Sequence, residues 1–138
     1  MLKQLMFVTL VGLVAAPAAA LACGGKKEVT TVSVDKAKEM KPAFVDANSK
    51  ETRTKLGVIP GAIMLTSYDG FDAGKELPKD KRKNLVFYCS NEMCSASKVA
   101  AGRAMEAGYS NVSVLPVGVK GWKAAGQKTV KPSDVGNS

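Results

Sequence analysis

Histidine is absent from this chain of 138 residues. Its absence excludes the usual Ser–His–Asp and Cys–His catalytic arrangements and the metal sites that are built on imidazole ligands. Cysteine is scarce as well, with Cys23, Cys89 and Cys94 the only thiols. A reactive thiol in this protein must therefore be activated by backbone dipoles or nearby cations, because no histidine base is present.

The sequence also lacks an apolar run long enough to span a membrane. Residues 5–14 are apolar, follow a positively charged start at Lys3, and lead into the small-residue-rich segment 15–22. A membrane-spanning helix needs about 20 apolar residues, whereas a charged start, a short apolar core and a small-x-small end are typical of a secretory signal. We therefore expect residues 1–22 to be a signal peptide and the protein to be exported, to the bacterial periplasm or to the outer membrane as a lipoprotein.

Cys23 would then be the first residue of the mature chain. Residues 20–25 resemble a bacterial lipobox, in which this cysteine carries the lipid, although Ala20 stands where a lipobox usually has leucine. Lipidation would tether the domain to a membrane through residues 23–28, a polar, glycine-containing linker. Plain secretion without a lipid remains the alternative.

The charge balance is basic, with a formal net charge of +8 that becomes +7 once Lys3 is removed with the signal. Most lysines are scattered, and the densest run, residues 79–83, is typical of a solvated turn. Because the protein is expected to be exported, we expect no nucleic-acid partner. A diffuse positive field is compatible with small anionic substrates.

The remaining chain predicts one α/β domain over residues 29–126, followed by a polar tail at 127–138 that we expect to fray. Strands are expected at 29–34, 43–46, 62–65, 85–88 and 112–115, and helices at 35–40, capped by Asp35, and at 49–56 and 95–107. Several strands are continuously apolar, which favours a mostly parallel central sheet with helices on both faces.

The most informative segment is the apolar strand 85–88, which runs into Cys89 and, after a short loop, into a helix. Ser95 and Ser97 offer hydroxyls for the start of that helix, and Gly108 fits its end. Ligands of parallel sheets bind at the carboxyl ends of the strands, and helix N-termini favour anions. We therefore expect Cys89 to have a lowered pKa and to act as a thiolate or as a persulfide carrier.

Four segments resemble the single-domain rhodanese-like sulfurtransferases, and the likeness covers about residues 29–126. Residues 45–48 (Val-Asp-Ala-Asn) resemble the family's strand that ends in Asp-x-Arg, and residues 57–62 (Gly-Val-Ile-Pro-Gly-Ala) resemble its Gly-His-Ile-Pro-Gly-Ala turn. Residues 86–95 resemble the active-site strand and loop, and residues 107–126 the closing strand and the tryptophan helix. The resemblance implies a rhodanese-like single domain.

The resemblance also implies a reaction. Cys89 would attack a small sulfur-containing anion such as thiosulfate, hold the transferred sulfur as a persulfide, and yield it to a thiol or cyanide-like acceptor, with no cofactor or metal. Asp46, at a strand end, would support the loop. The backbone N–H groups expected to cradle the sulfur belong to Ser90, Asn91, Glu92, Met93, Cys94 and Ser95.

One departure from the family opens alternatives. Cys94 holds the position where many family loops place an arginine, and the absence of a loop arginine argues against phosphoryl or arsenate chemistry. Cys94 could instead be a resolving thiol that forms a reversible disulfide with Cys89, as in an exported redox protein. A non-catalytic binding module with the same fold is a further alternative.

Overall fold

The computed structural model describes residues 27–137. The predicted signal peptide and the possible lipidation site at Cys23 lie outside the described residues, so both stay predictions. Within residues 27–137, no helix is long and apolar enough to cross a membrane.

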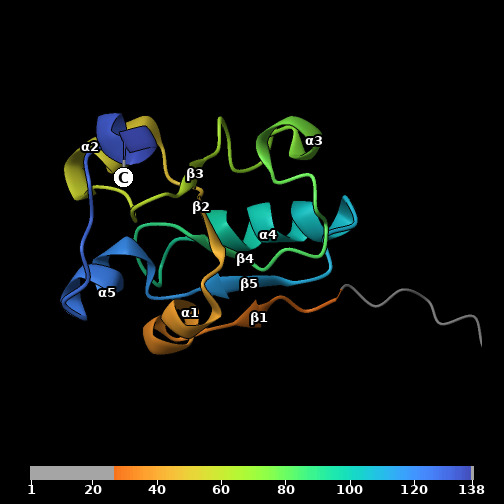
Figure 1. The fold of residues 1–138 in the computed structure, drawn as a ribbon, viewed down its shortest axis with the longest axis horizontal. Coiled ribbons are helices and arrows are strands. Elements are labelled where there is room, and N and C mark those ends of the chain that lie inside the picture. Colours follow the sequence, from red (N-terminus) through yellow and green to blue (C-terminus); the bar gives the residue numbers. More distant parts are fainter. Residues whose placement is uncertain (1–26, 138) are drawn as a thin grey trace, which may run out of the picture.

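A five-stranded sheet forms the centre of the domain (Figure 1). Its strands are β1 (Thr30–Thr31), β2 (Ala43–Asp46), β3 (Ile63–Met64), β4 (Leu85–Tyr88) and β5 (Val112–Leu115). They are all parallel, in the order β1-β5-β4-β2-β3, which confirms the predicted parallel α/β fold. Tyr88, the last residue of the central strand, pairs with Asp46 on one side and Leu115 on the other, so three strands end together.

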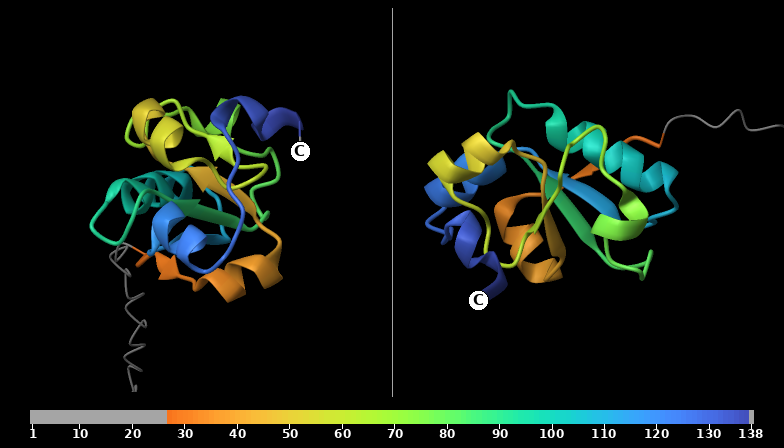
Figure 2. Two further views of the ribbon diagram at one scale, coloured as in Figure 1. Left: turned by 90° about the vertical axis from the view of Figure 1, so that its left-hand side faces the viewer. Right: turned by 90° about the horizontal axis from the view of Figure 1, so that it is seen from above.

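Helices cover both faces of this sheet (Figures 1 and 2). Residues of α4 (Ala96–Glu106) and the short α3 (Ala73–Glu76) pack against one face. Residues of α1 (Val34–Met40), α2 (Lys50–Leu56) and α5 (Gly118–Ala124) pack against the other. β4 is fully buried because its alternating side chains serve both cores.

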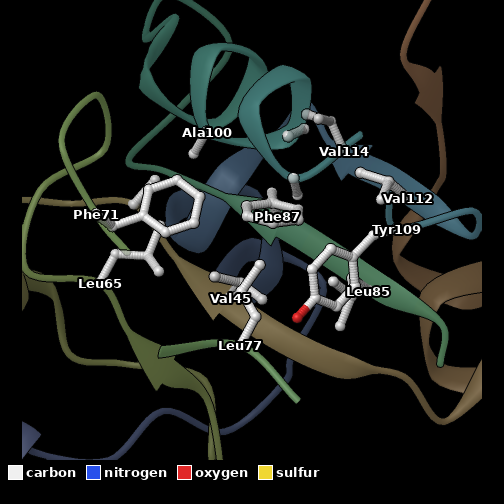
Figure 3. Close-up of a cluster of buried hydrophobic side chains, with 13 residues drawn as sticks. Val45, Leu65, Phe71, Leu77, Leu85, Phe87, Ala100, Tyr109, Val112 and Val114 are labelled. Atoms are coloured by element: carbon white, nitrogen blue, oxygen red, sulfur yellow. The ribbon is translucent and has the colours of Figure 1, made fainter. Parts of the chain in front are cut away.

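The core beneath α4 is centred on Phe87, which the close-up shows between the helix and the neighbouring strands (Figure 3). Val45 and Leu85 lie in the same cluster with the small helix residues Ala100 and Ala104, all fully buried. Alanines on the helix let α4 approach the sheet closely, and each large buried side chain contributes about 1.5–3 kcal/mol. This packing holds the N-terminal end of α4 firmly at the carboxyl edge of the sheet.

The beginning of the domain differs from the sequence prediction. β1 is only two residues long, because Ser33 rather than Asp35 caps α1 and Val34 already belongs to that helix. The Ser33 hydroxyl accepts a hydrogen bond from the Lys36 N–H at 3.2 Å, which satisfies one of the free donors of the first turn. Asp35 lies in that turn, where its charge complements the helix dipole.

The end of the domain also differs, since residues 127–137 do not fray from the body of the protein. Val130 forms an isolated antiparallel bridge with Val58, with both N–H···O distances at 2.9 Å. Trp122 donates its indole N–H to the Lys128 carbonyl oxygen at 2.8 Å, and a 3₁₀ helix follows at Pro132–Asn137. The tail is anchored because its backbone groups find partners in the domain.

Candidate active site

Cys89 follows β4 directly and lies at the carboxyl edge of the sheet, as predicted. The chain then curls through residues 90–95 and enters α4, whose N-cap residue is Ser95. Cys89 is almost completely buried, with 1% of its surface exposed, whereas Met93 in the same loop is 92% exposed. The loop therefore carries one thiol at its base and a projecting apolar side chain at its tip.

The N-terminal end of α5 holds this loop in place. The Val119 N–H donates to the Cys89 carbonyl oxygen at 2.9 Å, and the Lys120 N–H donates to that of Ser90 at 3.0 Å. Gly118 makes this approach possible, because a Cβ at this position would lie 2.6 Å from the Cys89 carbonyl oxygen. Its φ of +61° also falls in the left-handed region that glycine adopts without strain.

The surroundings of the Cys89 sulfur are polar. The Ser97 hydroxyl lies 3.5 Å from Sγ, and the Cys94 carbonyl oxygen accepts a hydrogen bond from the thiol at 3.1 Å. Ser97 is the second residue of α4 and is itself buried, so its hydroxyl contacts the Cys89 thiol away from solvent. Ser95, although it stands at the N-cap, makes no side-chain capping bond, because its backbone is helical rather than extended.

The expectation of a lowered pKa at Cys89 is wrong for the free thiol. Burial raises the pKa of Cys89, and contact with the Cys94 thiol raises it further, whereas the hydroxyl and N–H of Ser97 act in the opposite direction. Burial wins because the thiol is covered by the loop that was expected to activate it. Cys89 is therefore the less acidic thiol of the pair, with a pKa above the ordinary value.

Cys94 carries the more acidic thiol. Burial alone would raise its pKa, but hydrogen-bond donors around the sulfur outweigh burial and lower the pKa below the ordinary value. These donors are the Cys89 thiol, the Ala96 N–H, and the N–H and hydroxyl of Ser90. Both cysteines are free thiols in the structure. The loop thus makes Cys94 the more acidic thiol, five residues from the position that the sequence indicated.

The predicted cradle of six N–H groups is smaller than expected. The Cys94 N–H closes a turn onto the Asn91 carbonyl oxygen at 3.2 Å, and the Met93 N–H donates to the Asn91 side-chain oxygen at 3.0 Å. These two donors are engaged within the loop, and the Ser90 N–H lowers the pKa of Cys94 instead of binding at Cys89. Glu92 is exposed on the outer side of the loop.

Asp46 is buried at the end of β2, but it does not bind the Cys89 loop. Its Oδ1 atom accepts hydrogen bonds from the Asn48 N–H at 2.7 Å and from the Arg53 Nε at 3.0 Å. Arg53 also donates to the carbonyl oxygens of Asp46 and Leu65. The pair fixes β2, β3 and α2 together, so Asp46 supports the site through the sheet edge rather than by direct contact.

Sequence reasoning did not identify Arg53 or Gly118, and it gave Ser97 only a capping role. Arg53 gave no signal, because an arginine in an amphipathic helix ordinarily faces solvent. Gly118 had a weak signal, since a glycine at the start of a helix is an unusual choice that indicates a close backbone approach. Among residues 27–137, no three potential metal-ligating His, Cys, Asp or Glu side chains form a cluster.

Comparison with known proteins gives three findings at the level of the domain. A family model described as a rhodanese-like domain matches residues 31–125. The Alr3790 protein from Anabaena sp. superposes with a TM-score of 0.62 at 20% identity, over 77% of this chain and 86% of that one. No protein among the curated ones matches the chain.

Two further solved structures belong to longer proteins. A thiosulfate sulfurtransferase from Pseudomonas aeruginosa matches with a TM-score of 0.57 at 21% identity, over 72% of this chain and 19% of that chain. The CoADR-RHD protein from Bacillus anthracis, in reduced form, matches with a TM-score of 0.55 at 25% identity, over 74% of this chain and 18% of that chain. These similarities concern the fold of the domain.

Proposed function

This chain belongs to the family of rhodanese-like domains, and from that premise we propose that it is a sulfurtransferase that carries a sulfane sulfur as a persulfide on Cys89. One observation carries the proposal. The Cys89 thiol lies at the carboxyl edge of the parallel sheet, at the first turn of α4, with the Ser97 hydroxyl 3.5 Å from its sulfur. A similar domain occurs in a protein named as a thiosulfate sulfurtransferase.

The reaction has two balanced steps. In the first, Cys89 loses its proton to solvent and attacks the outer sulfur of a thiosulfate-like donor, whose S–S bond breaks as sulfite leaves with the bonding electrons. In the second, a nucleophilic acceptor attacks the outer sulfur, and Cys89 regains the electron pair. The Ser97 hydroxyl and N–H stabilise the negative charge that the Cys89 sulfur carries as a thiolate before the first step and after the second.

The donor does not need to be thiosulfate. Sulfonate oxygens are commonly held by an arginine fork, and the loop 90–95 contains no arginine. A donor without oxyanion oxygens, such as an inorganic polysulfide, needs no such fork. Both donors belong in the assay for this reason.

The test is sulfur transfer to cyanide by the purified chain, from thiosulfate and from polysulfide in separate assays. We expect wild-type protein to turn over with at least one donor and Cys89→Ser to show none. Ser110→Ala is the matched control, because Ser110 is exposed just before β5, at the amino edge of the sheet away from the loop. Wild-type turnover in Cys89→Ser, or no persulfide on the wild-type protein with either donor, would contradict the proposal.

A second candidate function is thiol–disulfide exchange, and the closeness of the two cysteines favours it, since the Cys94 carbonyl oxygen lies 3.1 Å from the Cys89 sulfur. In this case the oxidised protein holds a Cys89–Cys94 disulfide that a dithiol reduces. Absence of sulfur transfer by all proteins, together with reversible formation of that disulfide, would select the redox function over the transferase.

A further inference from the structure

Cys94 has properties that the proposed reaction does not use. Its carbonyl oxygen lies 3.1 Å from the Cys89 sulfur, so the two cysteines are neighbours within the loop. The N–H groups of Ser90 and Ala96, one from each end of the loop, lower the pKa of its thiol. Cys94 therefore lies next to Cys89 and has backbone donors from both ends of the loop around its own thiol.

The two thiols also differ in their access to solvent. Cys89 is 1% exposed beneath the loop, whereas Cys94 is partly exposed beside Met93, the 92% exposed residue at the tip. A small donor or acceptor can enter such a loop more easily than a bulky thiol can. A bulky acceptor therefore reaches the partly exposed Cys94 more easily than the buried Cys89.

We propose that Cys94 is a second sulfur carrier, which takes the sulfane sulfur from Cys89 and presents it to thiol acceptors at the rim of the loop. This inference rests on the proposed function, because it needs a persulfide on Cys89. It adds a catalytic residue to that function and assigns the acceptor class, a thiol too large to reach Cys89.

The transfer balances without an added oxidant or reductant. The Cys94 sulfur attacks the outer sulfur of the Cys89 persulfide anion, and a new S–S bond forms on Cys94. The S–S bond at Cys89 breaks, its electron pair returns to Cys89, and the proton of the Cys94 thiol moves to Cys89. One persulfide anion and one thiol enter the step, and one persulfide anion and one thiol leave it.

The surroundings of the two sulfurs favour this direction. The position of Cys89 favours the protonated thiol, mainly because it is buried, so Cys89 is a suitable site for the returning proton. The N–H groups of Ser90 and Ala96 lie around Cys94, where they stabilise the negative charge of the persulfide that forms on this residue.

The experiment maps the sulfur and then follows its release. The wild-type chain is loaded with polysulfide, its thiols are blocked by alkylation, and the protein is cleaved after Glu92 by a glutamate-specific protease or after Met93 by cyanogen bromide. Both cuts separate Cys89 from Cys94, which no cleavage at lysine or arginine does. We expect the additional sulfur on both fragments of the wild type, and no additional sulfur on Cys94 in the Cys89→Ser protein.

Release is measured on the loaded protein in a single turnover, with glutathione as the thiol acceptor. Cys94→Ser is expected to load Cys89 but to lose its sulfur to glutathione about tenfold or more slowly than wild type, because the intramolecular step is missing. Ser110→Ala, at the opposite edge of the sheet, again serves as the control and is expected to release sulfur at the wild-type rate.

The outcomes separate the two proposals. Sulfur confined to Cys89, with wild-type release from Cys94→Ser, would overturn the relay and leave the proposed function intact. Formation of a Cys89–Cys94 disulfide with loss of hydrosulfide would also overturn it, because Cys94 would then attack the inner sulfur. Sulfur on Cys94 of the Cys89→Ser protein, at the wild-type level, would overturn both the relay and the role of Cys89.

Discussion

Replacing Gly118 by alanine tests how the loop is positioned. Gly118 has a φ of +61°, and a Cβ built on it lies 2.6 Å from both the Cys89 carbonyl oxygen and the Ser90 carbonyl carbon. These are backbone atoms, so the contact cannot be relieved by a side-chain rotation. The loop and the N-terminal end of α5 must move apart.

The size of the effect follows from these distances. Left-handed backbone costs an alanine about 1–2 kcal/mol, and forcing an extra methyl group into a packed position costs about 1–3 kcal/mol more. Restoring an ordinary contact of 3.4 Å from 2.6 Å requires a backbone shift of about 0.8 Å. Because a misplacement near 1 Å can cost about 100-fold in rate, we expect kcat/KM for sulfur transfer to fall by about 10- to 100-fold.

Gly126 provides a matched control. Its φ of +78° imposes the same left-handed strain, but nothing lies within 4 Å of an added Cβ. Gly126→Ala is expected to lose only the strain energy, about 1–2 kcal/mol in urea unfolding, and to keep its rate of sulfur transfer. The difference between the two variants isolates the steric contact with the loop.

The assay combines urea unfolding, sulfur transfer from the better donor, and the rate of Cys89 alkylation, which reports loop position independently of turnover. The reasoning is refuted if Gly118→Ala matches Gly126→Ala in stability and in Cys89 alkylation rate. Such a result would show that α5 does not constrain the loop through this contact.

Three further predictions concern the thiols, a buried ion pair and the core. Iodoacetamide is expected to alkylate Cys94 before Cys89 at pH 7, because the pKa of Cys94 is lowered and that of Cys89 is raised. The rate of Cys89 alkylation is expected to rise further as the pH increases. Peptide mapping that finds Cys89 modified first would contradict the assignment. Arg53→Met is expected to destabilise the protein by about 3–5 kcal/mol in urea unfolding, because it leaves the Asp46 carboxylate buried without its 3.0 Å partner. A loss below about 1 kcal/mol, as found for exposed pairs, would show that the pair is not effectively buried. Trp122→Ala is expected to lower the free energy of unfolding by about 3–5 kcal/mol, because the residue is 6% exposed in the core on the α5 side of the sheet and its indole N–H is hydrogen-bonded. A change within about 0.5 kcal/mol, which is typical of surface substitutions, would contradict this prediction.

The central part of the fold was accessible from the sequence. Residues 85–88 and 112–115 were predicted to be strands with the bounds that the structure has, because continuous apolar runs between turn residues have few alternatives. Gly108 was identified as the end of α4, and its φ of +97° confirms the prediction. Less regular segments were harder, since Ser33 and Asp35 are both good capping residues and only the backbone conformation decided between them.

The candidate site was accessible only in part. The position of Cys89 followed from its place between an apolar strand and a helix. The protonation order of Cys89 and Cys94 did not, because it depends on how deeply the loop covers one sulfur and on which backbone donors reach the other. Gly118 lies 29 residues from Cys89 along the chain, so no local pattern could indicate that its backbone touches the loop.

The sequence by itself determined the class of fold and the residue at the carboxyl end of the central strand, and it excluded histidine-based chemistry. These properties depend on residue types and on local periodicity, which are written directly in the chain. The tertiary structure decided which of the two loop thiols is the more acidic, that Asp46 pairs with Arg53 instead of the loop, and that the start of α5 holds the loop in place. Burial and contact between distant segments determine these features, and both exist only once the chain has folded.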